Sequence, residues 1–177
     1  VVIKNNLVSG NVWGIDNYGS TALSIKGNKV GTDVTGTSSI PNQHGIYVQF
    51  CANISVGGTG INDGNLLSGN LLGGTGEGIY THFNNNITIA GNKIGTDITG
   101  TVAIPNYHGI RIDDQVAVIG GSTVSARNII SGNTFGVYVE GYSPAIQGNF
   151  IGTDITGTYA IPNGTGIKFY SGNSGEI

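Results

Sequence analysis

A 20-residue segment that occurs three times constrains the fold of this 177-residue chain more than any other feature. The copies read GNKVGTDVTGTSSIPNQHGI from Gly27, GNKIGTDITGTVAIPNYHGI from Gly91 and GNFIGTDITGTYAIPNGTGI from Gly148, at intervals of 64 and 57 residues. A shorter phrase recurs more often, a Gly followed by an apolar residue at Ile15, Ile46, Ile79, Ile110, Val137 and Ile167. The underlying period is therefore about 30 residues, and the long segment returns on every second period.

Each period contains three short runs that are rich in Val and Ile and bounded by Gly and Asn, which is typical of strands. The 32 glycines disfavour helices of ordinary length. Several strands within a fixed period indicate a solenoid, because one short strand buries its apolar face only against neighbouring turns. We predict an all-β, right-handed, single-stranded parallel β-helix with three sheets and about six coils, in which residues 1–177 form one domain.

An asparagine precedes the third short run of every period. We expect it at a tight corner in the left-handed backbone region, with its amide bonded to the next asparagine in a ladder along the axis. This structural ladder comprises Asn6, Asn28, Asn65, Asn92, Asn128 and Asn149. Two inward stacks should lie beside it, one of the six Gly-phrase residues and one of Val8, Val30, Leu67, Ile94, Ile130 and Ile151.

Charge and cysteine content exclude several kinds of function. The net charge is −3 and no basic run is present, which argues against nucleic acid as a partner. No apolar stretch is long enough for membrane insertion. The single cysteine, Cys51, forms no internal disulfide and is expected to be buried. We therefore expect a protein that neither binds nucleic acid nor inserts into a membrane.

The loops of the long segment offer few metal ligands. Asp33, Asp97 and Asp154 supply one carboxylate per loop, which makes a poor site for calcium, the only ion these loops suggest. We expect these aspartates to stabilise turns and predict no metal and no cofactor. His44 and His108 occur in two loops, but the third loop has no histidine, so we assign them no chemistry. The glycine-rich stretch 73–78 is interpreted as a turn, because no helix follows it.

The repeats resemble the pectate-lyase-like superfamily of right-handed β-helices. They are also similar to the IGTDxTGTxxIPNxxGI repeats of large secreted and surface proteins of bacteria and archaea, and the resemblance covers nearly the whole chain. It implies an extracellular or cell-surface location and, in the enzymes, a substrate on the outer face of the first sheet. It does not imply an activity, because this fold carries lyases, hydrolases, epimerases, adhesins and phage spikes.

The outward positions of the first sheet are rich in aromatic and charged residues. Strict alternation along each strand gives one column of Asp16, Tyr47, Tyr80, Arg111, Tyr138 and Lys168, and a second of Tyr18, Gln49, His82, Asp113, Glu140 and Tyr170. The second sheet presents only small, uncharged residues at Ser24, Ser55, Thr88, Ala117 and Ala145. Rings stack on sugar faces and charged groups bond hydroxyls or uronates, so we predict carbohydrate binding by Tyr47, Tyr80, Arg111, Tyr138, Lys168 and Tyr170.

Three interpretations of these columns remain open. The residues could be cross-strand pairs that only stabilise the sheet. They could bind a polysaccharide or surface glycan. They could form a catalytic site of Asp113, Glu140, His82 and Arg111, in which the two carboxylates lie about 5 Å apart, repel one another and raise one pKa. The short loops do not wall a cleft, which favours the non-enzymatic interpretations.

We therefore expect an extracellular structural or adhesive module, a unit of a surface protein or fibre that binds glycans. The alternative is a polysaccharide lyase, glycoside hydrolase or epimerase that acts on the same face. Residues 175–177 joined to residues 1–6 would continue the repeat, and neither end has a polar cap. We expect either a fragment of a longer solenoid or head-to-tail self-association into a filament.

Overall fold

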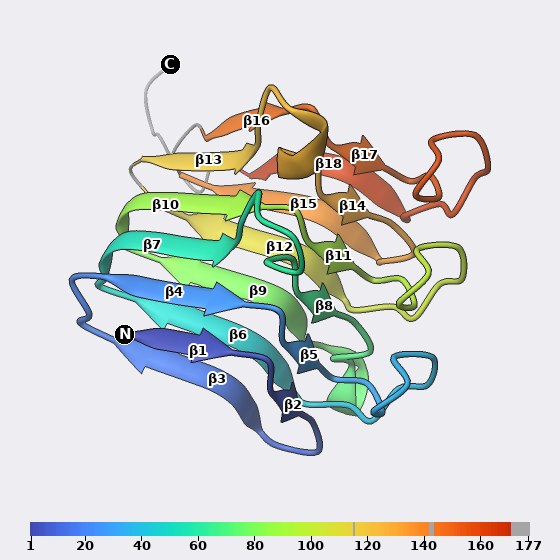
Figure 1. Cartoon of the computed structure of the whole chain (residues 1–177), viewed down its shortest axis with the longest axis horizontal. Helices are drawn as coiled ribbons and strands as arrows, with labels where there is room; N and C mark the ends of the chain where they lie inside the picture. Colours follow the sequence, from blue (N-terminus) through green and yellow to red (C-terminus); the bar gives the residue numbers. More distant parts are fainter. Residues whose placement is uncertain (115, 142–143, 171–177) are drawn as a thin grey trace.

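The computed structural model describes residues 1–114, 116–141 and 144–170, and it shows a parallel β-solenoid of about five turns. Three six-stranded parallel sheets surround one core (Figure 1). Successive strands along the chain enter the three sheets in rotation, and we call three such consecutive strands a rung. This architecture confirms the predicted all-β fold with three sheets. The expected continuation of the repeat at 175–177 lies outside the described residues.

The second sheet of the sequence analysis, here sheet A, runs along one side of the solenoid. It consists of β1 (Val2–Lys4), β4 (Leu23–Lys26), β7 (Ala52–Gly57), β10 (Asn85–Ala90), β13 (Ala117–Gly120) and β16 (Ala145–Gln147). Sheet B contains two-residue strands, namely β2 (Leu7–Val8), β5 (Lys29–Val30), β8 (Leu66–Leu67), β11 (Lys93–Ile94), β14 (Ile129–Ile130) and β17 (Phe150–Ile151).

Sheet C, the first sheet of the sequence analysis, has the longest strands. They are β3 (Trp13–Tyr18), β6 (His44–Gln49), β9 (Glu77–His82), β12 (His108–Asp113), β15 (Phe135–Glu140) and β18 (Thr165–Tyr170). Two short 3₁₀ turns, Leu72–Gly74 and Val124–Ala126, lie in the connections. Within the part of the chain that the structure describes, no helix is both long and apolar enough to cross a membrane.

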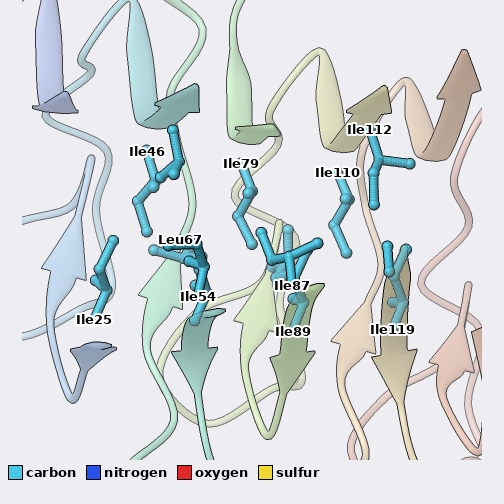
Figure 2. Packing of buried hydrophobic residues seen from close by; sticks show 14 of the residues in the cluster. Ile25, Ile46, Ile54, Leu67, Ile79, Ile87, Ile89, Ile110, Ile112 and Ile119 are labelled. Atoms are coloured by element: carbon cyan, nitrogen blue, oxygen red, sulfur yellow. The ribbon is translucent and has the colours of Figure 1, made fainter. Parts of the chain in front are cut away.

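The core is built from stacked aliphatic side chains. The Gly-phrase residues pair in register along sheet C, from Ile15 through Val137 to Ile167. The second predicted stack, from Val8 to Ile151, pairs in the same way along sheet B. Figure 2 shows Ile46, Ile79 and Ile110 in a row, opposite side chains of sheet A such as Ile54. Both predicted stacks are confirmed, and each fully buried aliphatic side chain contributes about 1.5–3 kcal/mol.

One outward position of sheet A was predicted wrongly. Ala117 pairs with Ile87 and is 5% exposed, so it faces the core, and Val118 takes the outward position beside Thr88. The run of Val, Ala, Val and Ile at 116–119 has no polar residue, so its register cannot be read from alternation. The outer face of sheet A nevertheless presents small or uncharged side chains at this column.

The predicted asparagine ladder runs along the corner between sheets A and B. Each side-chain Nδ2 donates to the Oδ1 of the asparagine in the next rung at 2.9–3.0 Å, from Asn6 to Asn149. The expected left-handed conformation at these residues is wrong. At four of the six positions the preceding residue has positive φ instead, as at Asn5 (60°) and Gly91 (73°). Asparagine is therefore required for its amide, which satisfies backbone groups in a corner closed to water.

A second asparagine ladder, which the sequence analysis missed, follows the corner between sheets B and C. Its members are joined by Nδ2 to Oδ1 bonds of 2.9–3.2 Å and are Asn11, Asn42, Asn70, Asn106, Asn133 and Asn163. The signal was present in the sequence, because the SGN and IPN phrases alternate from rung to rung. Both phrases deliver their asparagine to the same corner, although the loops before it differ in length.

The loops of the long segment project from the side of sheet B and lie above one another (Figure 1). In each, an aspartate accepts backbone N–H groups four and five residues ahead; Asp97 Oδ1 binds Thr101 N at 2.9 Å and Val102 N at 3.0 Å. This confirms the predicted turn role. The loops also contact one another, since Ile98 N donates to Gly36 O at 2.9 Å and Ile155 N to Gly100 O at 3.0 Å.

Candidate functional site

Sheet C places the two predicted outward columns side by side on its outer face. Register pairs Asp16 with Tyr47 and continues through Tyr80, Arg111 and Tyr138 to Lys168. In the second column, Gln49 and Asp113 flank His82 on neighbouring strands, and Glu140 pairs with Tyr170. Residues distant in the sequence therefore form one continuous surface.

Part of this surface is a closed aromatic stack. The rings of Tyr47 and Tyr80 lie 4.9 Å apart at an interplanar angle of 19°, and Trp13 stacks on Tyr47 at 5.1 Å. The Arg111 guanidinium lies 4.4 Å from the Tyr80 ring centroid. Burial raises the pKa of both tyrosines above the ordinary value. Their ring faces contact protein neighbours, so these two tyrosines act chiefly as cross-strand pairs.

The four candidate catalytic residues form two close side-chain pairs. His82 Nδ1 lies 3.0 Å from Asp113 Oδ2. Arg111 binds both carboxylate oxygens of Glu140, through Nε at 2.9 Å and Nη2 at 3.1 Å. Burial alone would lower the pKa of Arg111, but the Glu140 hydrogen bond and the charges of Tyr80, Glu140 and Glu77 together outweigh it, and the pKa is raised. Asp113 and Glu140 thus each contact a different basic side chain, and the contacts do not show the mutually repelling carboxylate pair that the spacing predicted.

A third outward column was missed by the sequence analysis. It precedes the glycine of each strand of sheet C and consists of Trp13, His44, Glu77, His108, Phe135 and Thr165. Glu77, only 5% exposed, lies between two histidines: its carboxylate is 2.6 Å from His44 Nδ1 and 3.7 Å from His108 Nδ1. Arg111 Nη1 approaches it at 3.6 Å. Burial raises the pKa of Glu77, but the imidazoles of His108 and His44 offset this and hold the pKa below its ordinary value.

Strict alternation failed here because the strands of sheet C bend at their glycine. In β6 both Gly45 and Ile46 are buried. His44 therefore lies on the outer face, although strict alternation from Ile46 would place it inward. A Cβ at Gly78 would lie 2.7 Å from Gly109 O and 3.1 Å from Asn106 Nδ2. Only glycine permits this close approach. The recurring residue before each glycine was the available signal for the column.

A hollow of about 300 Å³ opens where the first and third columns meet. It is lined by Tyr107, His108, Arg111, Phe135, Tyr138, Glu140 and Lys168. Its rings are turned across one another: Tyr107 and Phe135 meet at 73°, and Phe135 and Tyr138 at 74°. Lys168 Nζ lies 5.2 Å from the Phe135 ring centroid. Among the predicted carbohydrate-binding residues, Arg111, Tyr138 and Lys168 belong to this hollow, whereas Tyr47 and Tyr80 belong to the stack.

Other parts of the described surface offer less chemistry. A hollow of about 500 Å³ lies beside sheet B and is lined by residues that include Lys29, Lys93 and the loop around Asn62. The Lys29 ammonium already donates to the carbonyl of Val34. In residues 1–114, 116–141 and 144–170, no group of three or more His, Cys, Asp or Glu side chains is placed to hold a metal ion. Cys51 is buried at the corner between sheets C and A.

No protein-family model, curated protein or solved structure matches this chain. The geometry of the outer face of sheet C is therefore the basis on which a function can be assigned.

Proposed function

We propose that this chain is an extracellular structural or adhesive β-solenoid module that binds a glycan in the hollow of sheet C. The resemblance of its repeats to those of secreted and surface proteins of the pectate-lyase-like type supports the location. The stacked core and the two asparagine ladders support a rigid scaffold. A glycan-binding face on such a scaffold would attach a cell or fibre to a polysaccharide surface.

The crossed rings of the hollow are the observation that carries this proposal. The rings of Tyr47 and Tyr80 stack nearly in parallel, at 19°. Phe135 and Tyr138 meet edge to face at 74° instead, and both rings line the hollow. A pyranose presents an apolar face of C–H groups that packs on such a ring.

Polar groups at the rim suit the hydroxyls of a sugar. The Arg111 and Glu140 side chains hold one another in a fixed bidentate arrangement, leaving donors and acceptors oriented before any ligand arrives. Lys168 adds an ammonium beside the same rings. The arrangement combines an aromatic wall with preorganised polar groups, which is the usual composition of a small-ligand site.

Binding to immobilised pectin, alginate and neutral glycans tests the proposal. We expect Tyr138→Ala to weaken retention about two- to tenfold, because one aromatic contact is worth about 0.5–1.5 kcal/mol. Tyr159→Ala is the matched control, since Tyr159 is 72% exposed on a loop beside sheet B. If the wild-type chain binds none of these glycans, or if both variants behave alike, the proposal is wrong.

The alternative, a polysaccharide lyase, glycoside hydrolase or epimerase, has one observation in its favour. The 3.0 Å contact of His82 with Asp113 is the arrangement of a general base oriented by a carboxylate. The hollow, however, lies beside Arg111 and Glu140, which are already paired. We expect no product release when pectin, alginate or neutral glycans are incubated with the chain. Depolymerisation that disappears in Asp113→Ala and Glu140→Ala would overturn the non-enzymatic proposal.

A further inference from the structure

The corner that follows each strand of sheet C contains an unusual choice of residues. Gly19, Phe50, Phe83 and Gly141 occupy one equivalent position, because each donates its N–H to the carbonyl of the last residue of the next strand. All four have a left-handed backbone, with φ of 71°, 54°, 53° and 78°. These four corners therefore share one conformation, and two of the four rungs meet it with phenylalanine.

Neither backbone preference nor burial accounts for these phenylalanines. Glycine adopts the left-handed conformation freely, whereas a bulky side chain is strained there. The cost is not recovered in the core, since Phe50 is 50% exposed and Phe83 is 48% exposed. Strained residues with exposed apolar side chains gather at functional sites more often than elsewhere. The chain thus places two rings at this corner at the expense of its own stability.

Tyr18 extends the two phenylalanines into an aromatic ridge, the name used here for Tyr18, Phe50 and Phe83. The three rings come from successive rungs, with centroid distances of 5.4 Å and 5.6 Å along the solenoid axis. Neighbouring rings are tilted by 51° and 50°, and Tyr18 is 71% exposed. The ridge is therefore open to solvent, unlike the parallel stack of Tyr47 and Tyr80.

We propose that the aromatic ridge binds an extended, uncharged glycan that lies parallel to the solenoid axis and packs its sugar units against the three rings. This inference rests on the proposed glycan-binding function and adds a second contact region to it. The repeat of the rings is close to the length of one pyranose unit in an extended chain. Stacking on aromatic faces is the interaction that such a regular apolar spacing offers a sugar polymer.

The charges around the ridge favour an uncharged chain. The three rings carry no charge, and the Asp113 carboxylate beside them is paired with His82 at 3.0 Å. The His82 ring lies 3.9 Å from the Phe83 ring, which puts the His82–Asp113 pair within reach of hydroxyl groups on a bound sugar. An acidic polysaccharide would meet the Asp113 carboxylate without an unpaired cation at the ridge itself.

Replacement of the phenylalanines by glycine separates a binding role from a structural one. We compare Phe50→Gly, Phe83→Gly and the double variant with the wild type by calorimetry, using cellohexaose, xylohexaose and chitohexaose as probes. Glycine is the residue that two other rungs already carry at this position. We expect the double variant to bind the best probe at least about tenfold more weakly. Its Tm should stay constant or rise by up to about 4 °C, because the strained conformation is relieved.

Any other result contradicts the proposed glycan binding by the aromatic ridge. Unchanged affinity in the double variant does so directly, and a lowered Tm shows that the rings serve the fold. The hollow variant Tyr138→Ala, measured on the pectin, alginate and neutral-glycan panel, tells the two proposals apart. If wild-type protein binds that panel through the hollow but none of the three hexasaccharides, the ridge is wrong and the proposed function stands. If it binds nothing in either assay, both fall together.

Discussion

Asp114 shows how the chemistry of a single side chain departs from the pattern around it. It directly follows β12 at the corner between sheets C and A, where Asn84 N and Nδ2 donate to Asp114 Oδ1 at 2.7 Å and 3.0 Å. The residue is 2% exposed, and its Oδ2 has no hydrogen-bond partner among the described residues. Burial raises the pKa of the Asp114 carboxyl above its ordinary value of 3.8. An aspartate here is therefore less favourable than an asparagine, which would offer the same Oδ1 acceptor without a charge to bury.

We predict that Asp114→Asn stabilises the protein at neutral pH. The amide keeps the Oδ1 acceptor. It also adds an Nδ2 donor, equivalent to the Asn84 Nδ2 that binds Val48 O one rung earlier. The expected gain is about 1–2 kcal/mol. Since the folded wild type binds the proton more tightly than the unfolded chain, its stability falls as pH rises from 3.8 through the raised pKa. Urea unfolding at several pH values measures this, and parallel pH profiles for the two proteins would contradict it.

At the scale of elements, the asparagine ladders behave as structural elements in their own right. Asn92 is 1% exposed; its Nδ2 donates to Asn128 Oδ1 at 3.0 Å and Val56 O at 2.9 Å, and its Oδ1 accepts from Asn65. Asn6 is exposed at the edge of the same ladder. A buried asparagine in the middle of the ladder is therefore expected to contribute more to stability than an exposed one at its edge.

We predict that Asn92→Ala destabilises the protein by about 3–5 kcal/mol, because several buried polar groups lose their partner at once. Asn6→Ala is the matched variant, and we expect it to cost less than about 1 kcal/mol, since water replaces its bonds. Chemical denaturation of both variants gives the comparison. Equal losses would show that the ladder does not depend on burial.

The elements also show what sequence could and could not predict. Repeats fixed the register of Ile46, Ile79 and Ile110, because an apolar residue at a constant period has only one face to bury. The outer face was predicted in part. Glu77 was missed because the glycine bend of sheet C breaks strict alternation, and the aromatic ridge was missed because a positive φ at Phe50 leaves no pattern in the sequence. The angles between the rings in the hollow depend on side-chain rotamers, which cannot be predicted from the period of the repeat.

At the scale of the whole molecule, the strands of each rung pair only with those of the rungs on either side of it, and only the projecting loops bond across two rungs. Every sheet contains its strands in the order in which the chain forms them, with no strand inserted out of sequence. Stability is then close to a sum of rung and neighbour contributions. A defect in a central rung affects two interfaces, whereas one in an edge strand affects a single interface.

We predict that Ile79→Ala and Ile15→Ala differ both in how much stability they remove and in which strands they affect. Ile79 is fully buried in β9, and its loss should cost about 2–5 kcal/mol. Ile15 lies in β3, the edge strand of sheet C, and should cost less. Hydrogen exchange should show weaker protection in β6 and β12 for Ile79→Ala, but only in β3 and β6 for Ile15→Ala. Loss spread evenly over all strands in both variants would argue for a single cooperative unit.

The contacts between the projecting loops have a consequence for how such a chain can grow. Ile98 N reaches Gly36 O across an intervening rung whose own connection, the SGN phrase, is too short to take part. A solitary extra rung would shift every later loop out of phase and leave an amide such as that of Ile98 without its acceptor. Insertion or deletion of a matched pair of rungs would preserve the contact. The smallest unit by which this architecture can lengthen or shorten without losing it is therefore two rungs.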